Sequence, residues 1–567
     1  MTTLTDPPRE GFRLSQLIYD TRYRSMTIQV VALIGFLVLI GWLISNTAQN
    51  LADLGKEPSF RFLSEPAGYD INQRLIDYNN QHSHFRAAVT GVLNTLLVAV
   101  LGCIAATILG VLIGVLRLSK NWLVSRLMAV YVEIFRNVPV LLWIVFIMAI
   151  LIESLPKPRS FRGPDAETSM SLFGSTAFSN QGVFIPRLVP ANYFWVLILV
   201  VIVSVLGIRF LRRRADKIQE ATGDRPKTFL ASLGVAIVPF LIAFFAITAV
   251  TSNREQAFIG AGIQGVGTLE EFATEKGRIS YCHAGGDAGS LNGLRFLEAN
   301  DVQMRRRQYF SPSASLDAMA VGKCDLVTVA ASRTDSTIVE LKDRCFINNS
   351  THLQKGIDKA RAIIESGEGD VEKARTTIET NTGLIEKARV KCQALPLSVL
   401  PTTFTEGKAI EVELPAISEK GIPRFEGGTH LRNSLIALWI ALSLYTAAFI
   451  AEIVRAGILA ISHGQSEAAA ALGLRPNRIM SLVVLPQALR VIIPPLISNY
   501  LNLTKNSSLA IAVGYMDITG TLMGITLNQT GRELETVLLG MLIYLAISLS
   551  ISAVMNWYNN RMKLVER

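Results

Sequence analysis

The sequence predicts an all-α polytopic membrane protein with about eight transmembrane helices and an α/β domain inserted between them. Half of the 567 residues are hydrophobic and only 18% are charged, whereas soluble domains average about 25% charged residues. The apolar residues gather in blocks of roughly 20, which is the length that a helix needs to cross a bilayer. Residues 252–431 lack such a block and have the mixed composition of a soluble domain.

Eight apolar blocks are long enough to be transmembrane helices. They lie at 27–46, 88–116, 127–152, 192–210, 229–250, 433–454, 487–523 and 534–556. The seventh block is interrupted, so we expect a broken span there. The first block runs long and has no clear small-residue cleavage site, which favours a retained helix over a cleaved signal peptide.

Lysine and arginine residues indicate how the spans are oriented, because these residues concentrate in cytoplasmic loops. They cluster before the first span, between the second and third, after the fourth and at the C-terminus. With eight spans, all four clusters fall on one side. We therefore expect both termini to be cytoplasmic and residues 252–431 to be external. The net charge of +10 is then mainly a signal of topology and gives no reason to expect nucleic-acid binding.

The spans divide the chain into four regions. Residues 1–85 hold the first helix and an external segment, and 86–251 hold the second to fifth helices. Residues 432–567 hold the last three helices, with an internal loop at 456–486. Within the insert 252–431, strands and helices alternate in an α/β pattern. These predicted elements lie at 278–282, 291–299, 308–309, 315–321 and 325–330.

A second part of the insert, at about 352–392, carries apolar residues at helical spacing. It is either a helical hairpin or a plain pair of exposed helices. Four of the five cysteines lie in the insert, where an oxidising compartment would allow disulfides. They are Cys282, Cys324, Cys345 and Cys392, and four cysteines allow three pairings. Cys103 lies alone within a span.

The stretch 464–486, within the internal loop, predicts two short helices. Ser466 can cap the N-terminus of the first helix, and Glu467 would lie in its first turn, where the helix dipole favours a carboxylate. Residues 468–471 are all alanine. This helix therefore has a bare face that another surface can approach closely.

The second short helix is marked by glycine and proline. Gly473 suits the left-handed position that follows a helix, and Pro476 suits the first turn of the next one. We expect Pro486 to break that second helix just before the next span. A rigid helical unit between two spans could transmit force from a soluble partner.

The spacing of this stretch resembles the signature of ABC-importer permeases. It reads Glu-Ala-Ala, three residues, Gly, nine residues, an aliphatic residue, any residue and Leu-Pro, with Val483 where that family usually has Ile. In that family the loop is a coupling helix that docks into a groove on an ATPase subunit. The resemblance implies this role for Ser466, Glu467, Ala468, Ala469, Gly473 and Pro486.

Four further segments resemble permeases for polar amino acids. They are 131–139, 451–457, 486–490 and 503–509. The likeness implies a type I importer core in a bacterial inner membrane that moves polar L-amino acids from periplasm to cytoplasm. It also implies a second permease subunit or copy, a periplasmic amino-acid-binding protein and two ATPase subunits, which would bind ATP and Mg²⁺. This chain has no phosphate-binding loop of its own, and no cofactor or metal site is expected.

Several charged or polar residues in these segments would lie in or beside hydrocarbon and should face protein or water. Glu133 with Arg136, and Glu452 with Arg455, have i,i+3 spacing and can form ion pairs. Lys505, Asn506 and Ser507 follow a broken apolar run, where unwound backbone commonly lines a pathway. We interpret these three residues as a possible translocation path.

The first part of the insert resembles one lobe of a periplasmic amino-acid-binding protein. This likeness implies Cys282–Cys324 and Cys345–Cys392 as the disulfide pairs. However, Ala330 stands where those proteins generally carry an Asp for the ligand's amino group, and 283–290 lacks their usual threonine-rich run. The second lobe is also absent. These departures favour a scaffold or docking element over a working binding site.

Two other classes of membrane protein compete with an importer subunit. A ligand-sensing receptor would use the insert as its sensor, but it needs a cytoplasmic output domain, and the predicted internal segments are all short. An ion channel would not need an ATPase-docking loop. We therefore expect a transport subunit that is not itself an enzyme.

Overall fold

The computed structural model describes residues 21–53, 59–163, 166–222, 226–367, 370–418 and 422–562. Within these residues, seven helices are long and apolar enough to cross a membrane, and one bent pair raises the number to as many as eight. The seven spans involve α2 (Thr21–Asp53), α3 (His84–Leu116), α7 (Phe194–Thr222), α8 (Phe229–Ser252), α14 (Asn433–Leu459), α17 (Leu485–Asn506) and α19 (Glu533–Met562). The two termini, which were predicted to be cytoplasmic, lie outside the described residues.

The third predicted span, 127–152, is not one straight helix. It is formed by α4 (Trp122–Asn137) and α5 (Val140–Ser154), which are bent by 106° relative to each other. Val138 between them is extended, because a following proline disfavours helical backbone. Pro139 also lacks the N–H that would continue the helix. The prediction of a continuous helix is therefore wrong at this point.

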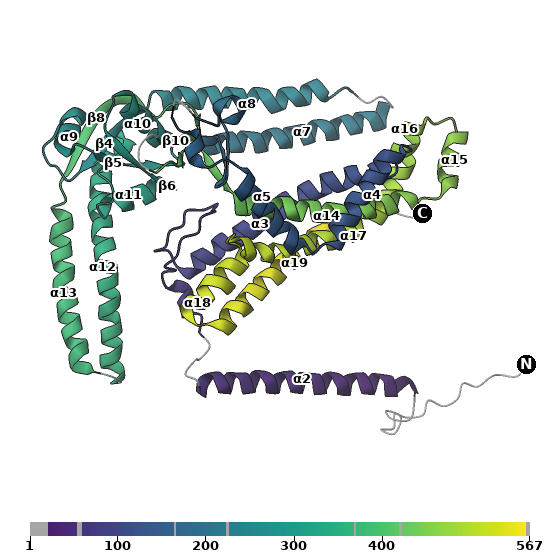
Figure 1. Ribbon diagram of the computed structural model, residues 1–567, viewed down its shortest axis with the longest axis horizontal. Coiled ribbons are helices and arrows are strands. Elements are labelled where there is room, and N and C mark those ends of the chain that lie inside the picture. Colours follow the sequence, from purple (N-terminus) through teal and green to yellow (C-terminus); the bar gives the residue numbers. More distant parts are fainter. Residues whose placement is uncertain are drawn as a thin grey trace, which may run out of the picture.

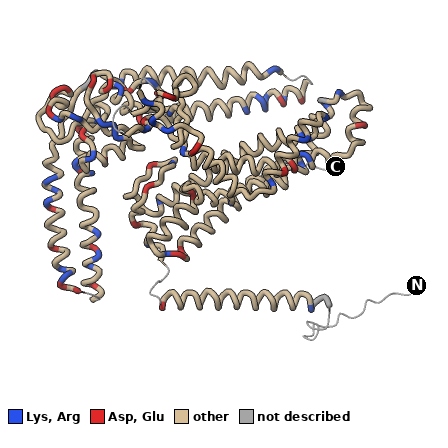
Figure 2. The backbone as a smooth tube through the Cα atoms, viewed as in Figure 1, with Lys and Arg blue, Asp and Glu red and all other residues tan. Residues whose placement is uncertain are grey.

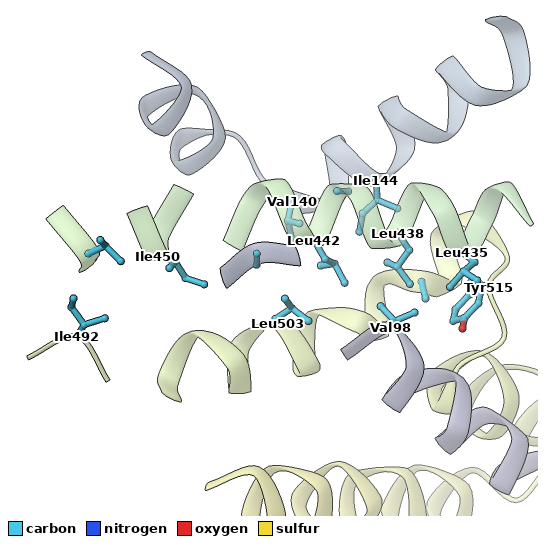
Figure 3. Close-up of a cluster of buried hydrophobic side chains, with 14 of the residues drawn as sticks. Val98, Val140, Ile144, Leu435, Leu438, Leu442, Ile450, Ile492, Leu503 and Tyr515 are labelled. Atoms are coloured by element: carbon cyan, nitrogen blue, oxygen red, sulfur yellow. The ribbon is translucent and has the colours of Figure 1, made fainter. Parts of the chain in front are cut away.

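A bundle core forms where α14 packs along α3 and contacts α5 and α17. Its buried apolar side chains meet in one cluster (Figure 3). The labelled members are Val98, Val140, Ile144, Leu435, Leu438, Leu442, Ile450, Ile492, Leu503 and Tyr515. These residues come from segments far apart in the sequence, so the cluster holds α3 and α5 against α14 and α17.

Small residues set the spacing between α3 and α14. A Cβ atom added at Gly110 would lie 2.6 Å from the Ile450 side chain, and one at Gly114 would lie 2.7 Å from the carbonyl oxygen of Ala451. Helices in lipid gain little from hydrophobic burial against one another, so close backbone approach and dispersion contacts hold them together. The glycines of α3 supply that approach.

The α7 and α8 helices pack against each other as an antiparallel pair (Figure 1). Only a small share of either helix is buried, and α2 is exposed along its length. Their apolar stretches expose many large hydrophobic side chains, as expected for surfaces in contact with lipid. The basic residues at the end of α7 lie at the same end of the molecule as the 456–486 loop (Figure 2).

The insert contains a five-stranded sheet in the order β6-β5-β7-β4-β8. Its strands are β4 (Glu255–Ala261), β5 (Ile279–Ala284), β6 (Met304–Tyr309), β7 (Leu326–Ala330) and β8 (Leu397–Thr405). β5 is parallel to β6 and β7, whereas β4 is antiparallel to β7 and β8. Helices α9 (Leu269–Lys276), α10 (Ala288–Ala299) and α11 (Pro312–Ala320) connect them.

The helices α12 (Thr334–Ser366) and α13 (Val371–Gln393) form a long hairpin that projects from this sheet (Figure 1). The hairpin begins earlier than the predicted 352, because the first half of α12 packs against the sheet domain through Leu341 and Cys345. Its outer part carries charged residues of both signs (Figure 2).

The insert shares two small sheets with the segment that connects α5 to α7. In one, β2 (Gly182–Ile185) lies between β1 (Ala177–Ser179) and β12 (Thr429–Arg432); in the other, β3 (Arg187–Pro190) pairs with β9 (Ile410–Glu413). A short ribbon of β10 (Ala416–Ile417) and β11 (Phe425–Glu426) follows. The two segments, which α7 and α8 separate in the sequence, are thus joined by backbone hydrogen bonds.

Candidate functional site

The 456–486 loop contains α15 (His463–Ala471) and α16 (Pro476–Ile479) at the end of the bundle farthest from the sheet (Figure 1). The helix α15 begins at His463, after Ser462, so the prediction that Ser466 caps it is wrong. Ser466 and Glu467 lie one turn further along, and the exposed Glu467 carboxylate is 3.6 Å from the His463 ring Nδ1. This i,i+4 contact takes the place of the predicted interaction with the helix dipole.

The two faces of α15 differ in exposure. Ala469 is buried in a cluster with Ile479 and Val484, which also contacts residues at the end of α14. Glu467 and Ala468 are exposed, and Leu472, an apolar side chain, is 84% exposed. One face therefore anchors the helix to the bundle, while the other presents a small, partly apolar surface.

Gly473 follows α15 with a φ of +79°, as predicted for the left-handed position after a helix. Pro476 begins α16, also as predicted. However, Pro486 does not break the helical path. The turn Met480–Val484 is a π-helix in which the Leu485 N–H bonds to the Met480 carbonyl, and Pro486 lies in the first turn of α17. The wider turn accommodates the proline, so the loop continues stiffly into the span.

Glu452 pairs with two arginines near the same end of the bundle. Its carboxylate accepts a hydrogen bond from Arg455 at 2.7 Å, so the predicted pair is present in the structure. It also pairs with Arg117, which lies just after α3. The C-terminal end of α3 is thereby held to α14, about one turn before the loop begins.

Glu133 and Arg136, in contrast, form no ion pair among the described residues. Glu133 accepts a hydrogen bond from the Asn137 side chain at 3.2 Å. The Arg136 guanidinium lies 5.4 Å from the centre of the Phe449 ring, a distance at which cation–π attraction operates. The prediction of this pair is wrong because Glu133 bonds to Asn137, one turn further along α4, and Arg136 lies against Phe449 of α14.

Of the three predicted path residues, Lys505 and Asn506 end α17, and Ser507 begins the helix that follows it. Lys505 is exposed, whereas Ser507 is buried and donates to the Thr504 carbonyl at 2.8 Å. The backbone is not unwound here, because α17 continues through Asn506 into the tighter helix η5 (Ser507–Val513). The break comes later, at Gly514, whose φ is +68°. A pathway role for Lys505 stays a prediction.

Comparisons with known proteins bear directly on this loop and its bundle. A sequence model of the family described as "Binding-protein-dependent transport system inner membrane component" matches residues 414–564. The glutamate/glutamine/aspartate/asparagine transport system permease protein BztB of Rhodobacter capsulatus is 41% identical across the full length of both chains. The chain belongs to the amino-acid ABC transporter permeases.

Two other full-length relatives agree with this assignment. The general L-amino acid transport system permease protein AapQ of Rhizobium johnstonii is 31% identical and covers 98% of this permease and 96% of its own length. The putative amino-acid ABC transporter permease protein YhdX of Escherichia coli is 30% identical and covers 96% of this permease and 95% of its own length. Since these matches span nearly the whole permease, they include its insert. Permeases of this family are multi-pass inner-membrane subunits and have no ATPase of their own.

A buried polar group inside the permease bundle was not predicted from the sequence. Asp517 is fully buried between η5 and η6 (Thr519–Thr526), and it accepts hydrogen bonds from the Gly520 N–H and the Tyr544 hydroxyl, both at 2.9 Å. Asn94 of α3 donates to the Met516 carbonyl at 2.8 Å. A lone carboxylate in a broken apolar run was the signal that could have pointed to Asp517.

Both disulfides of the insert are present: Cys282 pairs with Cys324 and Cys345 with Cys392, as the resemblance implied.

The insert also contains a second group that was not predicted from the sequence. On the side of the sheet opposite Cys282, the buried Glu413 of β9 contacts His283 of β5 at 3.1 Å and pairs with Arg306 of β6. Arg187 of β3 lies 3.7 Å from the same carboxylate. This buried charge cluster ties β3 and β9 to the five-stranded sheet.

The protonation states in the buried charge cluster follow from its geometry. Burial lowers the pKa of His283, so its ring is neutral at pH 7. The hydrogen bond from His283 and the nearby guanidiniums outweigh the effect of burial on Glu413 and lower its pKa. A carboxylate can only accept hydrogen bonds. His283 therefore donates through Nε2, and its Nδ1 accepts from the Ser290 hydroxyl at 3.3 Å.

Proposed function

We propose that this permease carries acidic amino acids and their amides into the cytoplasm as the membrane subunit of an ATP-driven importer. The observation that carries the proposal is the full-length similarity to a permease named for glutamate, glutamine, aspartate and asparagine. The proposed assembly includes a second permease subunit, two ATPase subunits that bind ATP and Mg²⁺, and a periplasmic amino-acid-binding protein.

The arrangement of the 456–486 loop supports its proposed role as the ATPase contact. The exposed face of α15, with Glu467, Ala468 and Leu472, is small enough for close docking. The opposite face packs on residues at the end of α14 and continues through α16 into α17. A displacement of α15 would therefore reach two spans directly, and it would reach α3 through the pair of Arg117 with Glu452.

The proposed orientation places the α15 end of the bundle in the cytoplasm and the insert in the periplasm. Basic residues between α3 and α4 and at the end of α7 support it, because cytoplasmic loops of membrane proteins are enriched in lysine and arginine. The two disulfides of the insert suit an oxidising periplasm.

We propose that the insert is a scaffold and not a second substrate-binding protein. The edge of its sheet that would bind a ligand is occupied by this chain itself. Arg187 donates to the Gly285 carbonyl at 2.7 Å, and Val189 packs against Ala288 and Leu291 at the start of α10. Substitution of Ser290 by Ala at this edge should leave the KM of uptake unchanged. A raised KM in a correctly assembled complex would instead favour a working binding site.

The main experiment is reconstitution of the complete complex in proteoliposomes with its own ATPase and binding protein. We expect ATP-dependent accumulation of glutamate, glutamine, aspartate and asparagine, and no accumulation with a non-hydrolysable ATP analogue. A complex that hydrolyses ATP but accumulates none of the four would contradict the proposal.

A further inference from the structure

An arginine-rich hollow lies on the edge strand of the five-stranded sheet. It has a volume of about 370 Å³ and is lined by the consecutive Arg305, Arg306 and Arg307 of β6, and by Arg424 and Glu426 beside β11. β6 is an edge strand, since the sheet order places it outside β5. The hollow is therefore open on the side away from the sheet.

The charges in this hollow are not balanced by the chain. Arg424 pairs with Glu426 at 2.8 Å, and Arg306 pairs with the buried Glu413. Arg305 and Arg307 form no ion pair within the described part of the chain. Four arginines thus face two carboxylates, which leaves two positive charges.

Two donor atoms at the hollow also lack acceptors. The Nε atoms of Arg306 and Arg307 are buried, and neither has a hydrogen-bond partner among the described residues. The chain therefore does not fully satisfy these guanidiniums, and the exposed Arg305 offers N–H donors to an incoming oxygen acceptor. Guanidinium groups match carboxylates particularly well, because two parallel N–H bonds can meet the two oxygens.

The hollow lies where the insert meets the bundle. Phe310 and Ser311 follow β6 directly; the Arg74 guanidinium lies 5.7 Å from the Phe310 ring centre, and Ser311 donates to the Asp77 carboxylate at 2.6 Å. On the other side, the chain runs from Glu426 through β12 into α14. This junction is at the end of the bundle opposite the 456–486 loop (Figure 1).

We infer that this hollow binds the carboxylates of acidic amino acids at the outer mouth of the permease. The inference rests on the proposed function, which makes acidic amino acids substrates. Glutamate and aspartate carry one net negative charge, whereas glutamine and asparagine carry none at neutral pH. Two uncompensated guanidiniums therefore favour glutamate and aspartate over their amides. The hollow binds these two acids selectively before they enter the transport path.

The test compares binding of radiolabelled L-glutamate and L-glutamine to the assembled complex in nanodiscs, without its binding protein. The variant is the double substitution Arg305→Gln/Arg307→Gln, which keeps the ion pair between Arg306 and Glu413. We expect glutamate binding to weaken by about tenfold, because charge-assisted hydrogen bonds are lost, while glutamine binding changes less than about twofold. Arg361→Gln/Arg375→Gln, at exposed positions of the hairpin, is the matched control and should change neither.

ATP-driven uptake of glutamine separates the possible failures. Wild-type complex that takes up none of the four amino acids contradicts the proposed function. If wild-type and variant both take up glutamine but glutamate binding is unchanged in the variant, the inference about the hollow is overturned. It is also overturned if uptake of both substrates falls equally while glutamate binding is unchanged. That result would assign the arginines to contact with the binding protein.

Discussion

The transmembrane bundle and the insert are each held together by different means. In the bundle, glycines of α3 bring its backbone against α14, and the core consists mainly of aliphatic side chains. In the insert, large aromatic residues such as Phe258 and Tyr281 are fully buried, and two disulfides and a buried charge cluster join its parts. The contrast follows from the solvent. Water drives apolar burial in the insert, whereas hydrocarbon leaves helices to associate through close contact.

The largest effect should come from adding bulk between α3 and α14. Gly114→Leu places atoms where the Ala451 carbonyl and the Val454 side chain already lie within 3 Å of a Cβ atom. Overpacking that neighbouring side chains can relieve typically costs about 1–3 kcal/mol and occasionally more. Here the Ala451 backbone itself must move, so we expect a cost above that range. We expect loss of the folded monodisperse protein in size-exclusion chromatography. Gly234→Leu in α8, where nothing lies within 4 Å, is the control and should behave like the wild type.

Removal of the central carboxylate should destabilise the insert and leave the bundle folded. Glu413→Gln would leave the largely buried Arg306 and the half-buried Arg187 without a counter-charge. Removing one partner of a buried pair costs up to about 3–5 kcal/mol. Thermal unfolding of the purified chain should show a lower Tm for the insert and an unchanged transition for the bundle. Glu386→Gln, on the exposed surface of α13, should not shift either transition. Equal shifts for both variants would contradict the importance of the buried charge cluster.

Loss of the disulfide at the base of the hairpin should have a somewhat smaller effect. Cys345 and Cys392 are 47 residues apart, and closing a loop of this length is worth about 4 kcal/mol in the chain-entropy description, with measured values of about 2–4. Cys345→Ser/Cys392→Ser should make the hairpin sensitive to limited proteolysis. Cys103→Ser in the bundle is the control and should leave the cleavage pattern unchanged.

The smallest effect is expected from pH. Burial lowers the pKa of His283 in the folded protein, while the unfolded value is about 6.5. The unfolded chain therefore binds the proton more readily, so this contribution to stability is complete above about pH 6.5 and is lost at about 1.4 kcal/mol per pH unit or less below it.

The pH effect is measured as a difference between two proteins. The Tm of the insert should fall between pH 7.5 and 5.5 by more in the wild type than in His283→Gln. Asp287, whose pKa burial raises to about 6, shifts stability in the opposite direction but is present in both proteins. Identical pH profiles would show that His283 does not titrate as described.

Much of the fold could be predicted from periodicity and composition. The seven helices with the bent pair fall on the eight apolar blocks, and the strands at Ile279–Ala284 and Leu326–Ala330 fall where alternation was seen. These signals are local, because the spacing of apolar residues within an element reflects which of its faces is buried. Gly473 and Pro476 were also predictable, since their backbone preferences are intrinsic.

The remaining features depend on contacts that no local pattern encodes. β3 and β9 pair across more than two hundred residues, and the buried charge cluster exists only because they do. The start of α15 at His463 and the π-turn before Pro486 are set by packing against the end of α14. Likewise, Glu133 and Arg136 had the spacing of an ion pair, but Phe449 and Asn137 offered other partners.

The central claim is that α15 is the surface through which an ATPase moves the bundle. Its most direct test is Ala468→Trp, which adds bulk to the exposed face without touching the buried Ala469. ATP-driven uptake in proteoliposomes should fall by at least about tenfold, on the scale of one lost interface anchor, although the chain remains folded. Lys120→Trp, also exposed in the loop after α3, should leave uptake intact. Wild-type uptake by Ala468→Trp would contradict the claim.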